Sequence, residues 1–108
     1  MSDDSPFDTS AAPERSRWTT QFEIQVGELP LQVQRLVLKA IRLREENPKH
    51  GSLRLHPLKD SKRGRHESGS YSISLNMKYR AIFVMDGATA IWYWAGSHAD
   101  YDRLIGDG

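Results

Sequence analysis

"YSISLNMKYRAIFVMDGATAIWYWAG", residues 71–96, decides the fold of this 108-residue chain. Residues 71–76 alternate apolar and polar side chains, as a strand with one buried face does. Residues 79–85 are almost wholly apolar, which is typical of a central strand covered on both faces. The Asp-Gly pair at 86–87 is a hairpin signal, and residues 89–96 form a further apolar strand. The stretch predicts a three-stranded antiparallel meander whose two tryptophans point together into the core.

Two elements and a tail are expected before this meander. Residues 18–26 ("WTTQFEIQV") alternate without a break and predict a half-buried strand. Residues 30–46 change to helical spacing and predict the main helix, which begins near Pro30 and ends before Pro48. Residues 1–17 are rich in Ser, Asp, Pro and Ala and predict a disordered tail, so the domain is expected to span residues 18–108.

A short helix is expected after the last strand, because Ser97 suits an N-cap and Asp100 follows three residues later. Tyr101, Leu104 and Ile105 would form its apolar face. The predicted fold class is α+β, with a small, mostly antiparallel sheet packed on one main helix and a short C-terminal helix.

Charge is strongly segregated although the net charge is only +1. Residues 35–80 carry 12 Lys or Arg against four acidic side chains, a net charge of +8, whereas residues 1–34 carry −4 and residues 81–108 carry −3. Part of the excess falls in a long irregular connection, residues 49–70, that also holds three histidines. Such a segment is typical of a surface that meets phosphates, and the alternative is an ordinary solvated face.

The remaining composition excludes several classes. The chain has no cysteine, so disulfides and thiolate metal sites are excluded and a reducing cytoplasm is the expected location. The N-terminus lacks the pattern of a secretory signal, and no apolar run approaches the roughly 20 residues that span a bilayer. The four histidines show no metal-ligand spacing, so neither a metal nor another cofactor is expected.

Three segments resemble the RelE/ParE superfamily of bacterial toxin–antitoxin toxins, over residues 18–105. "LRLHPLK" at 53–59 resembles the segment that follows the helix in several members. "YSISLNMKYRAIF" at 71–83 is similar to the paired central strands. "GSHADY" at 96–101 resembles the end of the last strand, where members place a catalytic histidine or tyrosine. The resemblance implies a RelE-like fold.

The resemblance also implies an activity. Ribonuclease members cut mRNA without a metal, commonly on the ribosome, and each is neutralised by a cognate antitoxin protein. The 2′-hydroxyl of the substrate attacks the adjacent phosphorus, so proton transfer and stabilisation of negative charge are required. Histidine is the usual group for such proton transfer.

Carried over residue by residue, the resemblance implies four catalytic positions. His98 would be the general acid or base and His56 a second histidine, while Arg80 would hold the phosphate or the sheet. Tyr101 would stack on a base or orient the site. The expected phosphate and RNA contacts are Arg54, Lys59, Lys62, Arg63, Arg65 and Lys78.

One position departs from the family. Several ribonuclease members carry an arginine where this chain has Ser74, and a serine cannot neutralise a developing phosphorane. Either Arg80, Lys78 or a loop arginine substitutes for it, or the chain is weak or silent as a nuclease. Each site residue also has a structural alternative: His98 as a surface residue near a cap, or Tyr101 as a core anchor. Arg80 could simply pair with a carboxylate such as Asp100.

Three functions remain in competition. The leading one is a metal-free endoribonuclease toxin. A ParE-like inhibitor of DNA gyrase would cut nothing and would not need His56 and His98. A non-catalytic binding module is the third, and Ser74 is its best support.

Overall fold

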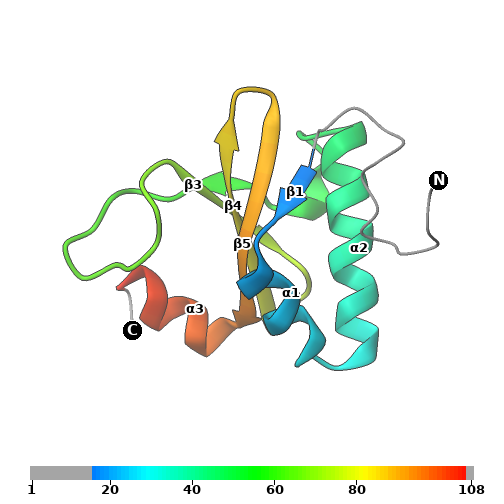
Figure 1. The fold of residues 1–108 in the computed structure, drawn as a ribbon, viewed down its shortest axis with the longest axis horizontal. Helices are drawn as coiled ribbons and strands as arrows, with labels where there is room; N and C mark the ends of the chain where they lie inside the picture. The colour runs from blue at the N-terminus through cyan, green and yellow to red at the C-terminus, as the bar shows by residue number, and fades with distance from the viewer. Residues whose placement is uncertain (1–15, 107–108) are drawn as a thin grey trace.

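A five-stranded sheet separates two helices on one face from a third helix on the other (Figure 1). The structure is a computed structural model that describes residues 16–106. In chain order the elements are β1 Ser16–Trp18, α1 Thr20–Gly27, α2 Leu31–Glu46, the 3-10 turn η1 Gly51–Leu53, β2 His56–Pro57, β3 Ser70–Ser74, β4 Tyr79–Asp86, β5 Thr89–Ser97 and α3 His98–Ile105. The strand order is β1-β5-β4-β3-β2, and only the β1–β5 pair is parallel. The predicted α+β class is therefore confirmed.

The predicted meander is present as β3, β4 and β5. Gly87 closes the second hairpin with a positive φ of 61°, which glycine adopts at little cost. The first hairpin is closed by the Asn76 side chain, whose Oδ1 accepts hydrogen bonds from the backbone N–H groups of Lys78 and Tyr79 at 2.8 and 3.0 Å. This polar turn therefore has a defined shape, which matters because the candidate site lies beside it.

The two tryptophans of β5 do not point the same way. Trp92 pairs with Phe83, and Trp94 pairs with Ile82, so Tyr93 between them is the extra residue of a bulge. Trp92 is fully buried against Phe22 of α1, whereas the Trp94 ring lies 6.2 Å from that of Tyr101 in α3. The bulge thus gives each face of the sheet one tryptophan and corrects the expectation that both enter one core.

The predicted strand over residues 18–26 is wrong, since most of it forms α1. The Thr19 hydroxyl accepts the backbone N–H of Phe22 at 3.1 Å and caps the helix. Phe22 and Val26, four residues apart, are buried, whereas Ile24 between them is 52% exposed. An alternating pattern includes every fourth residue, so it also contains a one-sided helical stripe.

The main helix α2 lies close to its predicted bounds and covers the same face of the sheet. Val33 is buried, and Val37 and Ile41 belong to the core cluster that contains Phe83. Arg44 is also buried on this face, with its guanidinium 5.3 Å from the centre of the Phe83 ring, and desolvation lowers its pKa. No helix within residues 16–106 has both the length and the apolar content that crossing a bilayer requires.

The expected tail boundary at residue 17 falls inside β1. Ser16 is 3% exposed, and β1 pairs with Ala90–Trp92 of β5. The expectation for residues 1–15 lies outside the described residues. Order therefore begins at least two residues earlier than predicted, because a three-residue strand is too short to show a periodic pattern.

Removing residues 2–17 is expected to lower the melting temperature by several degrees. The deletion removes the parallel pairing of β1, which together with the buried Ser16 should stabilise the fold by about 1–3 kcal/mol. Circular dichroism during heating measures the change. A deletion of residues 2–10 leaves β1 intact and serves as the control. An unchanged melting temperature after the longer deletion would contradict a structural role for β1.

Candidate functional site

A basic hollow lies where η1, the β3–β4 turn and the start of α3 meet. Its volume is about 400 Å³. The residues that line this basic hollow are Ser52, Arg54, Ser74, Leu75, Asn76, Met77, Arg80 and His98. Three of the predicted site residues, Arg54, Arg80 and His98, therefore come together although 44 positions separate the first from the last.

His98 is held in place by backbone and side-chain contacts. The Ser97 hydroxyl accepts the N–H of Asp100 at 3.1 Å, which starts α3, and the His98 N–H donates to the carbonyl of Lys78 at 2.7 Å. The imidazole Nδ1 lies 3.0 Å from Oδ2 of Asp102, and the His98 side chain is 47% exposed. No protein group within residues 16–106 takes its Nε2, so this nitrogen is open to a ligand. Asp102 was not predicted; its i,i+4 spacing from His98 was the available signal.

Arg80 lies directly across from Ser74 in the β3–β4 register. Its Nη1 donates to the carbonyls of Asn76 and Tyr79 at 2.6 and 3.0 Å. The alternative pairing of Arg80 with Asp100 does not occur, because Asp100 pairs with Arg103 on α3. The guanidinium thus braces the turn that forms one wall of the basic hollow.

Arg54 supplies the second positive charge of the basic hollow. It follows η1 with φ 48° and ψ 43°, and it is the one non-glycine residue with a positive φ among residues 16–106. Such a conformation costs an arginine about 1–2 kcal/mol, and strain of this kind tends to collect at functional sites. Arg54 therefore lines the same hollow as Ser74. It is a loop arginine that could take the place of the family arginine, where this chain has Ser74.

His56 and Tyr101 form a second cluster, around a serine that sequence reasoning missed. Ser72 is fully buried and lies opposite His56 in the register. Its Oγ accepts from the Tyr101 hydroxyl at 3.1 Å and is 3.1 Å from His56 Nε2. The Nδ1 of His56 is 3.4 Å from the carbonyl oxygen of Arg54. The His56 ring is thus engaged by protein groups and does not line the basic hollow.

Tyr101 links this cluster to His98. Its hydroxyl is 3.4 Å from His56 Nε2, and its ring centre is 6.1 Å from that of His98. Tyr101 is only 6% exposed and packs on Trp94, so its ring is not available to stack on a base. The structure places Tyr101 as the core anchor that was its structural alternative, and a role in orienting the site stays a prediction. The alternation of residues 71–76 marked Ser72 as facing away from Ile73, but a serine alone gave no signal of a site.

The basic loop, which we define as residues 58–69 between β2 and β3, lies at the other end of α3. The backbone N–H of Arg65 donates to the Leu104 carbonyl at 2.6 Å, and the Arg63 backbone lies close to Gly106. An eight-residue helix is about 12 Å long, so these contacts are far from His98 at its start. Four of the predicted RNA-binding residues belong to this loop, namely Lys59, Lys62, Arg63 and Arg65, and only Lys78 and Arg54 belong to the elements around the basic hollow.

Tyr93 anchors the end of this loop to the sheet. Its hydroxyl accepts the Glu67 N–H at 2.9 Å and lies 2.6 Å from the Ser70 hydroxyl. Ser70 donates to the Glu67 carbonyl, so Tyr93 donates to Ser70. Burial is the main cause that raises the pKa of Tyr93. Tyr93, the bulge residue of β5, therefore fixes one end of the basic loop through these contacts.

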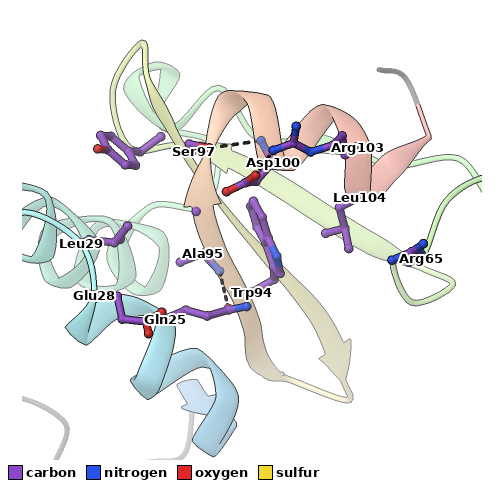
Figure 2. Close-up of a pocket in the computed structure, with 12 residues that line it drawn as sticks. Gln25, Glu28, Leu29, Arg65, Trp94, Ala95, Ser97, Asp100, Arg103 and Leu104 are labelled. Atoms are coloured by element: carbon purple, nitrogen blue, oxygen red, sulfur yellow. Dashed lines mark hydrogen bonds and ion pairs between the residues drawn. The ribbon is translucent and has the colours of Figure 1, made fainter.

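Another hollow, of about 570 Å³, is a groove along the part of β5 that extends beyond its pairing with β1. Figure 2 shows Gln25 and Glu28 on its α1 side and Arg103 and Leu104 on its α3 side. The Gln25 side chain accepts the Ala95 N–H at 3.0 Å and so satisfies the strand edge. Neither histidine of the candidate site lines this groove, so the smaller basic hollow is the better candidate for chemistry.

Asp100 stands at the rim of this groove and is engaged by its own helix. The hydrogen bond from Arg103, and then that from Ser97, hold the pKa of the Asp100 carboxyl below its usual range. Within residues 16–106, no three His, Asp or Glu side chains gather as a metal ion would require. The charged or proton-transferring residues that line the basic hollow are one histidine and two arginines.

The fold and the basic hollow define a small α+β domain with a cationic, histidine-bearing site at one end of its sheet. The sequence profile of the ParE-like toxin domain matches residues 34–103. The chain therefore belongs to the ParE-like toxin domain family, within the RelE/ParE superfamily of toxin–antitoxin toxins, and the resemblance noted in its sequence is confirmed. No protein with a curated description matches the chain significantly.

Several solved structures share the fold. YafQ from E. coli strain BL21(DE3) has a TM-score of 0.61 at 17% identity, covering 82% of this chain and 98% of its own. The YoeB/ParE toxin from Agrobacterium tumefaciens has a TM-score of 0.62 at 16% identity, covering 78% and 98%. The RelB–RelE antitoxin–toxin complex from Methanococcus jannaschii has a TM-score of 0.57 at 17% identity, covering 82% and 98%. At these identities the likeness concerns the fold.

Proposed function

We propose that this protein is the toxin of a toxin–antitoxin module and acts as a metal-free endoribonuclease that cuts mRNA on the ribosome and thereby inhibits translation. The observation that carries the proposal is the basic hollow, where His98 lines one cavity with Arg54 and Arg80. A proton-transfer group with cations beside it is what cleavage of an RNA phosphodiester requires.

In the proposed reaction the ribose 2′-oxygen attacks the adjacent phosphorus. A bond forms between O2′ and phosphorus, the bond from phosphorus to O5′ breaks, and the products carry a 2′,3′-cyclic phosphate and a free 5′-hydroxyl. His98 Nε2 removes the 2′-hydroxyl proton. Arg54 and Arg80 stabilise the charge that develops on the phosphoryl oxygens. Each of these roles contributes only if the groups are held in place before RNA binds.

His56 is the second histidine of the proposal and would protonate the leaving O5′. In the structure its ring faces Ser72 and Tyr101, so direct proton transfer requires the side chain to rotate toward the basic hollow. The side chain is exposed, which leaves room for such a rotation. His56→Ala is therefore expected to slow cleavage less than His98→Ala does.

The proposed RNA contacts fall into two groups according to their distance from the basic hollow. Lys78 stands on the turn beside the basic hollow and would contact a phosphate next to the cut. Lys59, Lys62, Arg63 and Arg65 would contact phosphates further along the strand, at the far end of α3. Such contacts are expected to weaken steeply with salt and independently of RNA sequence.

A cognate antitoxin is the proposed protein partner. RelE from M. jannaschii is described in complex with the antitoxin RelB. On this chain the outer side of α2 offers a groove of about 400 Å³ with an apolar floor from Leu38 and Leu43. Arg35, Lys39 and Arg42 line it against one acidic residue, Glu46, and this net positive charge suits an acidic amphipathic segment.

Induced expression in bacterial cells tests the proposed function. Growth arrest accompanied by new mRNA 5′ ends within coding sequences is the expected result, measured by growth curves and by 5′-end mapping before and after induction. Arrest with intact mRNA would point to the gyrase-type alternative, which gyrase supercoiling assays would then test. No arrest from a folded protein would leave the non-catalytic binding module.

A further inference from the structure

His98 does not stand alone in the basic hollow, because a carboxylate lies against one of its two ring nitrogens. Oδ2 of Asp102 lies 3.0 Å from Nδ1 of His98, the distance of an ion pair when the imidazole is protonated. The two residues are four positions apart on α3, where side chains of a helix lie one above the other. The Asp102 side chain is 32% exposed, and among residues 16–106 His98 is the one partner of its carboxylate.

This contact favours one of the two neutral forms of the His98 imidazole. An ionised carboxylate can accept a hydrogen bond but cannot donate one, so the proton is favoured on Nδ1, the nitrogen that lies against it. In the neutral imidazole Nε2 is then unprotonated and presents its lone pair. A histidine in this tautomer can accept a proton at Nε2 at once, without first exchanging protons with water.

The rest of α3 fixes where this lone pair lies. The His98 backbone is bonded to the Lys78 carbonyl, and the buried Tyr101 holds the same helix turn against the sheet. The charged residues that line the basic hollow together with the imidazole are Arg54 and Arg80, and Asp102 lies on the helix of His98 itself. Among residues 16–106, Asp102 is the one anion in contact with the imidazole.

We propose that Asp102 is a positioning residue for the reaction, which holds His98 in the Nδ1–H tautomer and stabilises the imidazolium that forms when Nε2 takes the 2′-hydroxyl proton. This inference rests on the proposed endoribonuclease function. Asp102 touches neither the RNA nor the reacting atoms; it acts through His98, in the way a buried aspartate orients the histidine of a hydrolase triad.

The first test measures the tautomer and needs no RNA. Nitrogen-15 NMR of the imidazole at a pH where His98 is neutral is expected to show the Nδ1–H form in the wild type and a shift toward the Nε2–H form in Asp102→Ala. Asp100→Ala is the matched control, since Asp100 is an aspartate on the same helix that pairs with Arg103. An unchanged tautomer in Asp102→Ala overturns the inference.

The second test measures cleavage of a defined RNA. Asp102→Ala is expected to lower kcat about 10²-fold with little change in KM, and Asp100→Ala to leave kcat within about threefold. Because Asp102 acts through His98, adding Asp102→Ala to His98→Ala should cost nothing further, whereas a merely structural role would add its own loss. A further loss in the double variant overturns the inference. A wild type that cuts no RNA, on or off ribosomes, overturns the proposed function instead, while the tautomer result still reports on the pair.

Discussion

Replacing His98 with alanine is expected to abolish growth arrest and to lower the rate of RNA cleavage by about 10²–10⁴-fold, the usual contribution of one well-placed general acid or base. Stability should change little, because the side chain is 47% exposed and the substitution removes only a surface pair with Asp102. Such a pair contributes a few tenths of a kcal/mol at most. The measurements are single-turnover cleavage and thermal unfolding of the same preparations.

His50→Asn is the matched control for this loss. His50 is an exposed histidine just before η1, and its Nδ1 accepts the backbone N–H of Ser52 at 3.2 Å. Asparagine keeps an acceptor at this cap and removes the imidazole. His50→Asn should arrest growth as the wild type does. If His98→Ala also still arrests growth while folded, the assignment of His98 is wrong.

The part of the fold that could be predicted is the part with long periodic segments. The helix over residues 30–46 and the three strands from residue 71 on each contain enough turns or alternations to exclude the other period. The segment 18–26 fails because Trp18, Phe22 and Val26 satisfy both periods at once. Thr19 decides between them: its side chain caps a helix, and a cap outweighs an alternation that leaves Ile24 exposed.

The residues of the candidate site likewise fall into those that the sequence could predict and those that it could not. Residues that stand at the end of a predictable element, such as His98 and Arg80, could be assigned from the sequence because the element determines where they lie. Ser72 and Asp102 are ordinary surface or strand residues in the sequence and gain a role only from contacts between elements or between helical turns. The charge segregation predicted a basic region, but the contact of Arg65 with Leu104, which places the loop at the far end of α3, depends on tertiary packing.

Replacing Arg54 with glycine is expected to lower the cleavage rate without lowering the stability of the fold. Its φ of 48° and ψ of 43° are free of steric cost in glycine and cost an arginine about 1–2 kcal/mol. The unfolded chain of the glycine variant is also more flexible, which offsets this gain in stability by about 0.4–1 kcal/mol. The melting temperature of Arg54→Gly should therefore equal or exceed that of the wild type by up to a few degrees.

The same substitution should lower the cleavage rate by about 10²–10³-fold, because it removes a cation from the basic hollow, where Ser74 provides none. Arg54→Lys keeps the charge and the backbone strain, so its rate should lie between the two and its melting temperature near that of the wild type. Arg63→Ala, at the far end of α3, is the control: it removes only a distant phosphate contact, so the rate at saturating RNA should be unchanged while the salt dependence of binding becomes shallower. If Arg54→Gly cuts RNA at the wild-type rate, Arg54 does not replace the family arginine, and Arg80 with Lys78 must stabilise the phosphorane alone. If its stability instead falls by more than about 2 kcal/mol, contacts of the Arg54 side chain outweigh the relief of its backbone strain.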